Sequence, residues 1–345
     1  MSSSPRLFDL APRLPTTREV AARVKAGGTA ALTESERRAD SARYVEIACR
    51  SALNRVRGMP FEWTLNPYRG CTHGCHYCFA RRYHTQFEMN TGDEFASVIL
   101  VKTNVVSVLA REVDRPAWRR ELVALGTATD PYQPIEGRYR LTRGALEILA
   151  RARTPVGLVT KGPMVVRDID VLLALSRVAA CTVFMSVPTV DEEAWAQLEP
   201  GTAHPMQRLR AVSELAAAGV NVGVLMAPVV PGFSSAPAKL ERTVRAIADH
   251  GARFLGCNVM YLQDGTRAHF MDMLSRDFPA LVPRYQRLYR AKYPPDSYRR
   301  QVTGMVRLLQ DRYGPWPGRA AGPAAENDAD EPGEVAQPEQ AGFRW

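Results

Sequence analysis

The sequence lacks the segments that direct a chain into or across a membrane. No uninterrupted apolar run is long enough to span a bilayer. The first fifteen residues, MSSSPRLFDLAPRLP, have no apolar core of the signal-peptide type. We therefore expect a soluble, cytoplasmic protein without membrane partners, whose six cysteines stay reduced.

Phosphate-binding loops are absent and lysine is scarce. Neither a G-x-G-x-x-G nor a P-loop pattern occurs, so nucleotide phosphate binding of those kinds is not predicted.

With only five lysines among 345 residues, a lysine at a predicted strand end carries more information than an arginine would. The formal charge is still +9, and residues 1–318 carry +13, because from Arg319 onward six acidic residues oppose two arginines. This balance favours anionic partners, nucleic acid included.

Three cysteines gathered in one short stretch are the clearest chemical signal. In NPYRGCTHGCHYCF, Cys71, Cys75 and Cys78 follow a C-x₃-C-x₂-C spacing, and Gly70 and Gly74 free the backbone to turn the sulfurs toward one centre. Thiolates are soft ligands for iron–sulfur clusters or zinc. A structural or electron-transferring cluster usually takes four cysteines. Three ligands leave one metal position for a substrate, as catalytic metal sites do.

Two other interpretations of these cysteines stay open. A zinc site would need a fourth ligand, which His73, His76 or Cys257 could provide. Disulfides are the other alternative, although Cys181 and Cys257 lie in apolar runs where free buried thiols are common.

After the cysteines, apolar strands alternate with amphipathic helices. Strands are predicted over residues 97–101, 121–127, 155–160, 182–187, 220–226 and 253–261. Helices are predicted over residues 104–113, 141–152, 168–179, 205–218 and 239–250. This alternation is typical of βα units and a parallel sheet. We predict an α/β fold, a partial, open (β/α)₆ TIM-like barrel, rather than a two-domain Rossmann protein.

Four regions are expected along the chain. Residues 1–57 would form an N-terminal arm and a helix, which a capping box at residues 33–36 opens and which runs to about Asn54. Residues 58–280 would form the barrel, with a strand at 61–65 and a helix at 78–86 on either side of the cysteines. Residues 281–314 would form two basic helices, 283–292 and 296–313, and residues 315–345 a disordered tail.

The basic C-terminal helices permit two hypotheses. Residues 284–312 combine eight Lys and Arg with Tyr285, Tyr289, Tyr293 and Tyr298. Such a segment could hold a polynucleotide backbone and stack its bases. Alternatively, the tyrosines pack over the barrel and the basic residues form a solvated face.

The cysteine stretch, with an aromatic residue after its third cysteine, resembles the radical S-adenosylmethionine (SAM) superfamily. This resemblance implies a [4Fe–4S] cluster on Cys71, Cys75 and Cys78, whose fourth iron chelates the methionine end of SAM. These three cysteines are the predicted catalytic and metal-binding residues.

Polar residues at the predicted strand ends could bind SAM. Ligands bind at the carboxyl ends of parallel strands. Lys161 offers a cation to the SAM carboxylate, and Ser186 a hydroxyl to the carboxylate or ribose. The SAM ammonium needs oxygen acceptors, and aromatic residues beside Cys78 could contact adenine. The predicted cofactor-binding residues are Tyr77, Phe79, Thr127, Thr129, Asp130, Lys161 and Ser186.

Further motifs over about residues 50–275 resemble the spore photoproduct lyase-like branch of radical SAM proteins, often labelled DNA repair photolyase. They are NPYRGC, HGC, YC, TDPYQPIE, TKGP with RDID, SVPT, LEP and APVVPG. Spore photoproduct lyases carry a hydrogen-donor cysteine at the strand end that here reads Ala124-Leu125-Gly126-Thr127. Because no cysteine lies there, dimer repair by that route is not expected.

The resemblance implies reductive cleavage of SAM to a 5′-deoxyadenosyl radical that abstracts hydrogen from a substrate, with DNA as a candidate in lyase-like or repair-like chemistry. An electron donor such as flavodoxin or ferredoxin would be a partner. Two alternatives remain: a radical SAM maturase acting on a protein or small molecule, and a zinc- or cluster-bearing nucleic-acid-binding protein without radical chemistry.

Overall fold

The computed structural model describes residues 42–83 and 94–316, and its main feature is a seven-stranded sheet. The strands lie in the order β10-β9-β8-β7-β6-β3-β2. Six of them run parallel: β3 (Trp63–Leu65), β6 (Val123–Leu125), β7 (Val156–Thr160), β8 (Cys181–Ser186), β9 (Val222–Val229) and β10 (Leu255–Val259). The edge strand β2 (Leu53–Arg55) is antiparallel to β3. Six parallel strands in an open sheet confirm the predicted partial (β/α)₆ barrel.

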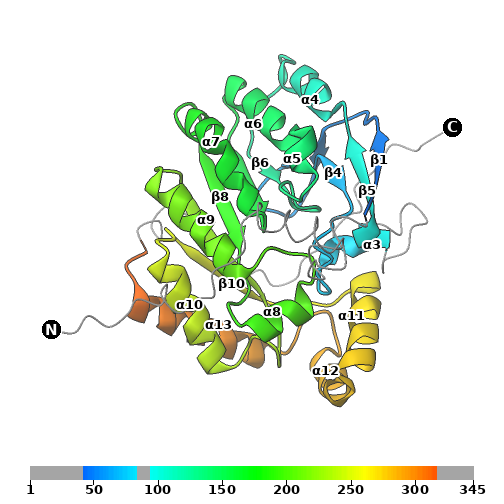
Figure 1. The fold of residues 1–345 in the computed structure, drawn as a ribbon, viewed down its shortest axis with the longest axis vertical. Coiled ribbons are helices and arrows are strands. Elements are labelled where there is room, and N and C mark those ends of the chain that lie inside the picture. Colours follow the sequence, from blue (N-terminus) through cyan, green and yellow to red (C-terminus); the bar gives the residue numbers. More distant parts are fainter. Residues whose placement is uncertain (1–41, 84–93, 317–345) are drawn as a thin grey trace, which may run out of the picture.

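Helices cover the outside of these strands (Figure 1). They are α6 (Leu141–Arg151), α7 (Ile169–Ser176), α9 (Pro205–Ala217) and α10 (Pro237–Asp249). Strand residues such as Leu158, Val183 and Val224 are completely buried. The main core therefore lies between sheet and helices, and the loops at the strand ends are left to carry chemistry.

A smaller three-stranded sheet corrects two predictions. It consists of β1 (Arg43–Ile47), β5 (Val98–Lys102) and β4 (Tyr68–Arg69), in the order β1-β5-β4. The helix predicted up to Asn54 is wrong over β1, because these β-branched and aromatic residues pair in parallel with β5. The predicted capping box lies outside the described residues. The strand predicted at 97–101 exists, but in this sheet rather than in the barrel.

The chain reaches and leaves this sheet through short helices. They are η3 (Phe79–Tyr83), α3 (Glu94–Ser97) and α4 (Val105–Val113). The helix predicted over residues 78–86 is a 3₁₀-helix as far as Tyr83, and the rest of that prediction lies outside the described residues. Between the barrel strands lie α5 (Glu136–Tyr139), η5 (Pro163–Asp168) and α8 (Glu192–Leu198).

The C-terminal helices lie against β10, α10 and η3. They are α11 (Asp264–Asp277), η6 (Pro279–Leu281), α12 (Val282–Leu288) and α13 (Asp296–Tyr313). Tyr285 and Tyr289 are buried, and their hydroxyls donate to the carbonyl oxygens of Pro231 and Met260 at 2.6 and 2.8 Å. These two tyrosines pack over the barrel, as one of the two hypotheses predicted. Trp316, expected to begin a disordered tail, is also buried.

Within the described residues, no helix is both long enough and apolar enough to cross a membrane.

Candidate active site at the cysteine loop

The cysteine loop, residues 66–79, follows β3 at the carboxyl end of the barrel strands. Gly70 and Gly74 adopt positive φ angles of 80° and 59°. A Cβ on Gly70 would lie 2.6 Å from the carbonyl oxygen of Val98, so only glycine fits there. Cys71 and Cys75 are buried and Cys78 is partly buried. The loop therefore brings three thiols to one side of the barrel mouth.

The segment after β6 holds the loop from the barrel side. The Thr129 hydroxyl donates to the Gly70 carbonyl oxygen at 2.6 Å. The Gln133 side chain donates to the same oxygen at 3.3 Å and accepts from the Thr72 amide at 3.3 Å. Thr129, predicted to bind SAM, and Gln133 thus fix the loop backbone. Thr127 lies nearby and is partly buried, just after Gly126.

Asp130 forms an ion pair that joins the loop to the next strand. One oxygen lies 3.3 Å from His73 Nδ1 and accepts from the Lys161 amide at 2.6 Å. The other accepts from the Thr160 hydroxyl at 2.6 Å and the Tyr132 amide at 2.8 Å. Burial alone would raise the pKa of Asp130, but His73 and these hydrogen bonds lower it to about 2. All four of its acceptor positions are used within the protein.

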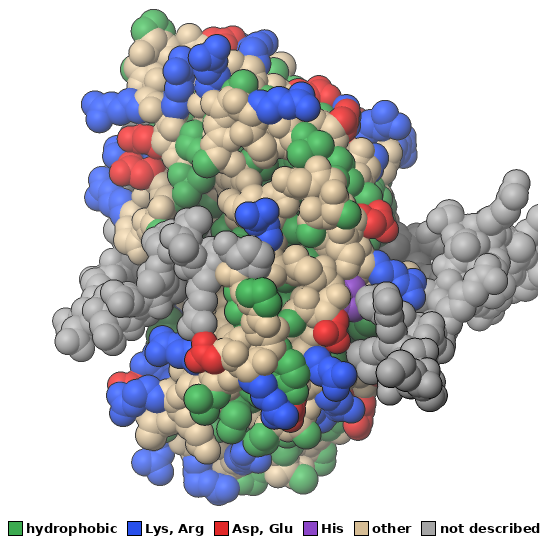
Figure 2. Space-filling model, turned by 90° about the vertical axis from the view of Figure 1, so that its left-hand side faces the viewer, with side chains coloured by type: hydrophobic (Ala, Val, Ile, Leu, Met, Phe, Trp, Pro, Cys, Tyr) green, Lys and Arg blue, Asp and Glu red, His purple; other side chains and the backbone are tan. Residues whose placement is uncertain are grey.

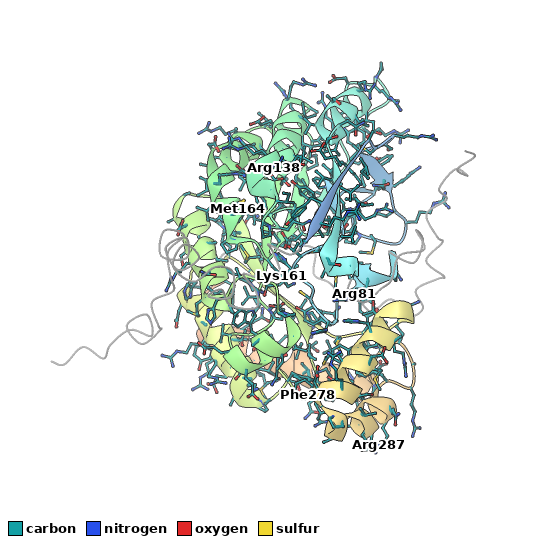
Figure 3. The ribbon with its side chains drawn as sticks, turned by 45° about the vertical axis from the view of Figure 1, so that its right-hand side comes forward. Arg81, Arg138, Lys161, Met164, Phe278 and Arg287 are labelled. Carbon is teal, nitrogen blue, oxygen red and sulfur yellow. The ribbon has the colours of Figure 1, made fainter. Side chains whose placement is uncertain are left out.

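Arg81 supports the loop from the other side. It is almost completely buried and donates to the carbonyl oxygens of Cys75 at 3.1 Å and Gly74 at 2.6 Å. Its guanidinium lies 4.9 Å from the Phe95 ring centroid. From α11, the Thr266 hydroxyl donates to the Cys78 carbonyl oxygen at 3.1 Å. Figure 3 shows Lys161 and Arg81 near the middle of the molecule and Arg287 at its lower edge.

The loop after α8 packs its backbone directly against the cysteines. The His76 amide donates to the Leu198 carbonyl oxygen and the Gly201 amide to the His73 carbonyl oxygen, both at 3.0 Å. A Cβ on Gly201 would lie only 2.1 Å from the Thr72 carbonyl oxygen. Only glycine therefore fits at this position.

Replacing Gly201 with Ala is expected to lower stability by about 1–3 kcal/mol through overpacking and to reduce the iron retained per chain. Urea unfolding and iron analysis after anaerobic reconstitution measure both effects. Gly304→Ala is the matched control, because nothing lies within 4 Å of its Cβ position in α13. That variant should gain about 0.5–1 kcal/mol. Unchanged stability and iron content in Gly201→Ala would contradict the packing described.

Lys161 and Ser186 meet at the ends of β7 and β8, as predicted. Lys161 Nζ donates to Ser186 Oγ at 2.9 Å and lies 5.7 Å from the Tyr77 ring centroid. It also lies 3.7 Å from Glu199 Oε1. Burial alone would lower the pKa of Lys161, but the negative charges of Glu199, Cys75 and Cys78 together outweigh it and raise the pKa. The lysine is therefore held charged beside the cysteine loop.

Glu199 is the centre of this polar network. Its carboxylate accepts from the Tyr77 hydroxyl and pairs with Arg208 at 2.6 Å. Arg208 also donates to the Ser186 carbonyl oxygen at 3.0 Å. Burial would raise the pKa of Glu199, but Arg208 and Lys161 lower it. Two buried cations thus share one carboxylate, and the network carries one excess positive charge facing the site.

Some of these functional residues were missed in the sequence. Arg81, Glu199 and Arg208 were not predicted, although Glu199 stands in the LEP motif. The available signal was Arg208, a charged residue at a buried position of α9. Glu136, the last residue of the TDPYQPIE motif, is fully buried and accepts from Tyr68 and Arg167, the latter at 3.0 Å.

The three thiols fit an iron–sulfur cluster. All six cysteines are free, which excludes disulfides in this structure. Burial raises the pKa of Cys75 and Cys78, and the charge of neighbouring Cys71 raises both further. Bound iron would supply the positive charge that such thiolates need. In the described part of the chain, no three His, Cys, Asp or Glu side chains are placed to hold one metal ion, as a zinc site would require. The cysteines of a four-iron cluster each bind a different iron, so they need not meet at one point.

Comparison with known proteins identifies the family. Residues 65–245 match the sequence pattern described as the Radical SAM superfamily. The chain belongs to this superfamily. Membership implies a [4Fe–4S] cluster and S-adenosylmethionine as cofactors, and a partner that supplies electrons.

One relative of this radical SAM protein is an uncharacterized protein of Mycobacterium tuberculosis. The two sequences are 40% identical over 278 residues, and the alignment covers 79% of this chain and 82% of the relative. An uncharacterized protein of Methanocaldococcus jannaschii is 23% identical over 187 residues, and this alignment covers 54% of this chain and 68% of the relative. A spore photoproduct lyase variant with bound AdoMet and dinucleoside spore photoproduct has a similar fold, with a TM-score of 0.63 at 16% identity, over 83% of this chain and 84% of the lyase.

Proposed function

We propose that this radical SAM protein removes a hydrogen atom from a nucleic-acid substrate and that Cys71, Cys75 and Cys78 hold its cluster. The observation that carries the proposal is the loop itself, which presents two buried thiols and one partly buried thiol, no fourth cysteine, and a charged lysine nearby. When bound, the cluster supplies the electron that cleaves SAM to methionine and a 5′-deoxyadenosyl radical. The protein holds SAM in place and excludes water.

Lys161 is proposed to bind the SAM carboxylate, with Ser186 as its hydrogen-bonding neighbour. The excess positive charge of the Glu199 network supports this role, because a buried carboxylate ligand would balance it. Thr127 is proposed to accept from the SAM ammonium. Asp130 contributes by positioning, since its own acceptors are used by His73 and the strand end.

Two aromatic residues of the cysteine loop are proposed to line the adenine site. Phe79 follows Cys78, and its ring centroid lies 6.4 Å from that of Tyr261 at the end of β10. Tyr77 lies between Cys75 and Cys78, with its ring under Lys161 and its hydroxyl on Glu199. Both residues directly follow a cluster cysteine or lie between two of them, which supports a contact of their rings with an aromatic ligand.

Replacing Lys161 with Ala is expected to weaken SAM binding. The loss of a hydrogen bond between charged groups costs about 1.5–3 kcal/mol, or roughly a tenfold to 150-fold increase in Kd. Equilibrium dialysis with labelled SAM on the reconstituted protein measures it. Lys239→Ala is the matched control, because Lys239 pairs with Asp191 on the helical exterior. Equal Kd values for the two variants would remove Lys161 from the SAM site.

A nucleic-acid substrate is supported by charge and by fold. Residues 1–318 carry +13, and the solved structures with this fold include a spore photoproduct lyase with a bound dinucleoside. Figure 2 shows Lys and Arg side chains spread over one face of the molecule rather than joined in one patch. The strand end at Leu125 and Gly126 carries no cysteine, so we propose hydrogen abstraction without that type of donor.

Anaerobic turnover with reduced flavodoxin, SAM and deuterated thymidine oligonucleotides tests the proposal. The expected result is deuterium in 5′-deoxyadenosine. Cleavage of SAM without deuterium transfer from any labelled oligonucleotide would retain the radical chemistry and reject nucleic acid as the substrate. Absence of SAM cleavage in iron-loaded, reduced protein would reject both.

A further inference from the structure

Two aromatic rings lead away from the cysteine loop toward the C-terminal helices. Beyond Phe79 lies Tyr261, and the ring centroid of Tyr261 lies 5.5 Å from that of Tyr293, in the connection between α12 and α13. Both tyrosines are only partly buried. They differ in this from Tyr285 and Tyr289, whose burial removes them from any contact with a ligand.

Two cations lie against these rings. Lys292 Nζ is 5.3 Å from the Tyr261 ring centroid and 5.2 Å from that of Tyr293. The Arg299 guanidinium carbon is 5.1 Å from the Tyr293 centroid. Aromatic faces attract cations and restrict where they can point. The Lys292 carbonyl oxygen accepts from the Leu262 amide at 2.9 Å, which ties this connection to the end of β10. The cations are therefore positioned before any ligand arrives.

Within the described residues, the charge of Lys292 is not balanced and one N–H group of Arg299 has no acceptor. Lys292 forms no ion pair with a carboxylate in this part of the chain, whereas Lys161 and Lys239 each do. Arg299 pairs with Asp296, but its buried Nε finds no hydrogen-bond partner among the described residues. A buried N–H without an acceptor costs about 1–3 kcal/mol. An anionic oxygen at this place would satisfy both groups.

From this we infer that Lys292 and Arg299, backed by Tyr293 and Tyr261, form a phosphate-binding site for the substrate. SAM has no phosphate, so the site is distinct from the SAM contacts. Phosphate suits an arginine and a lysine together, because the guanidinium donates in a fork and the ammonium acts as a point charge. A nucleotide bound here would direct its sugar and base toward Tyr261, and so toward the neighbouring SAM site. The inference rests on the proposed nucleic-acid substrate, whose placement it specifies.

Fluorescence anisotropy with labelled dodecathymidylate, at several salt concentrations, tests the site without requiring catalysis. Each phosphate contact in single strands contributes about 0.7 to the slope of log affinity against log salt. Lys292→Ala and Arg299→Ala should each reduce the magnitude of the slope by about that amount. Tyr293→Leu should weaken binding, and Tyr293→Phe, which keeps the ring, should bind as wild type does. Circular dichroism verifies that each variant is folded.

Arg253→Ala is the matched control, because this exposed arginine precedes β10 and so lies at the opposite end of the same strand. It should leave the slope unchanged. Competition by thymidine monophosphate at similar concentrations would identify a nucleotide rather than a polymer as the source of the phosphate. A slope unaffected by Lys292→Ala and Arg299→Ala, or lowered equally by Arg253→Ala, overturns the inference. It is likewise overturned if flavodoxin, and not the oligonucleotide, binds in a Lys292-dependent manner. SAM cleavage by the reconstituted wild type is scored separately, so failure here does not count against the radical chemistry.

Discussion

Replacement of Cys71, Cys75 or Cys78 by Ala is expected to abolish SAM cleavage. Each cysteine would ligate one iron of the cluster, and two remaining thiolates cannot hold it stably. After anaerobic reconstitution, visible absorbance and iron content should fall together with the yield of 5′-deoxyadenosine, which should reach the background without enzyme. Since the three thiols lie on one loop held by Thr129, Gln133 and Arg81, the three variants should behave alike.

Cys257→Ala provides the control for this experiment. Cys257 is a free thiol on β10, outside the cysteine loop, so its removal should leave iron content and SAM cleavage intact. Retained SAM cleavage in any of the three loop variants would contradict the assignment of the cluster ligands. Loss of iron in Cys257→Ala would indicate that Cys257 is a fourth protein ligand, which would leave no iron position for SAM.

Glu199→Ala should be the most destabilising substitution outside the cysteine loop. It leaves Arg208 and Lys161 buried without their shared carboxylate, and Tyr77 without its hydrogen-bond acceptor. Breaking a buried ion pair in this way costs about 3–5 kcal/mol. Urea unfolding of the apo protein measures the change in the free energy of unfolding.

Glu192→Ala controls for the loss of a carboxylate as such. Glu192 lies on the same helix–loop unit, but its side chain is 67% exposed and pairs only with His204 among the described residues. Its removal should change stability by less than about 0.5 kcal/mol. If Glu199→Ala and Glu192→Ala lower the free energy of unfolding by similar amounts, the buried network does not stabilise the protein as expected.

The spacing of apolar residues predicted the helices and the barrel strands well wherever one face of the element is buried. The helix predicted at 296–313 is α13 (Asp296–Tyr313), with Val302, Val306 and Leu309 buried at helical spacing. Periodicity could not show which sheet a strand joins. The β-branched run of β5 pairs with β1 and β4, and long-range pairing of this kind is not encoded in a local pattern.

Candidate site residues could be found in the sequence where a motif or a strand end marks them. Residues whose role depends on contacts between distant parts of the chain could not be found in this way. The cysteines and Lys161 stand at positions fixed by the motif and by a strand end. Asp130 stays a predicted SAM-site residue, and its ion pair with His73, which sits on a loop 57 positions earlier in the chain, had no local signal in the sequence. Glu199 and Arg208 acquire their roles only when α8 and α9 pack against the cysteine loop.

The most direct test of the central claim is to ask what occupies the iron that the three cysteines leave open. Electron–nuclear double resonance on the reduced protein with SAM labelled with ¹⁵N at its amino group answers this. If SAM binds this iron, a ¹⁵N hyperfine coupling from its amino group should appear and should disappear when unlabelled SAM replaces it. A coupling from a protein histidine nitrogen instead, unchanged by the SAM label, would show that the chain itself ligates this iron and would rule out SAM as its ligand.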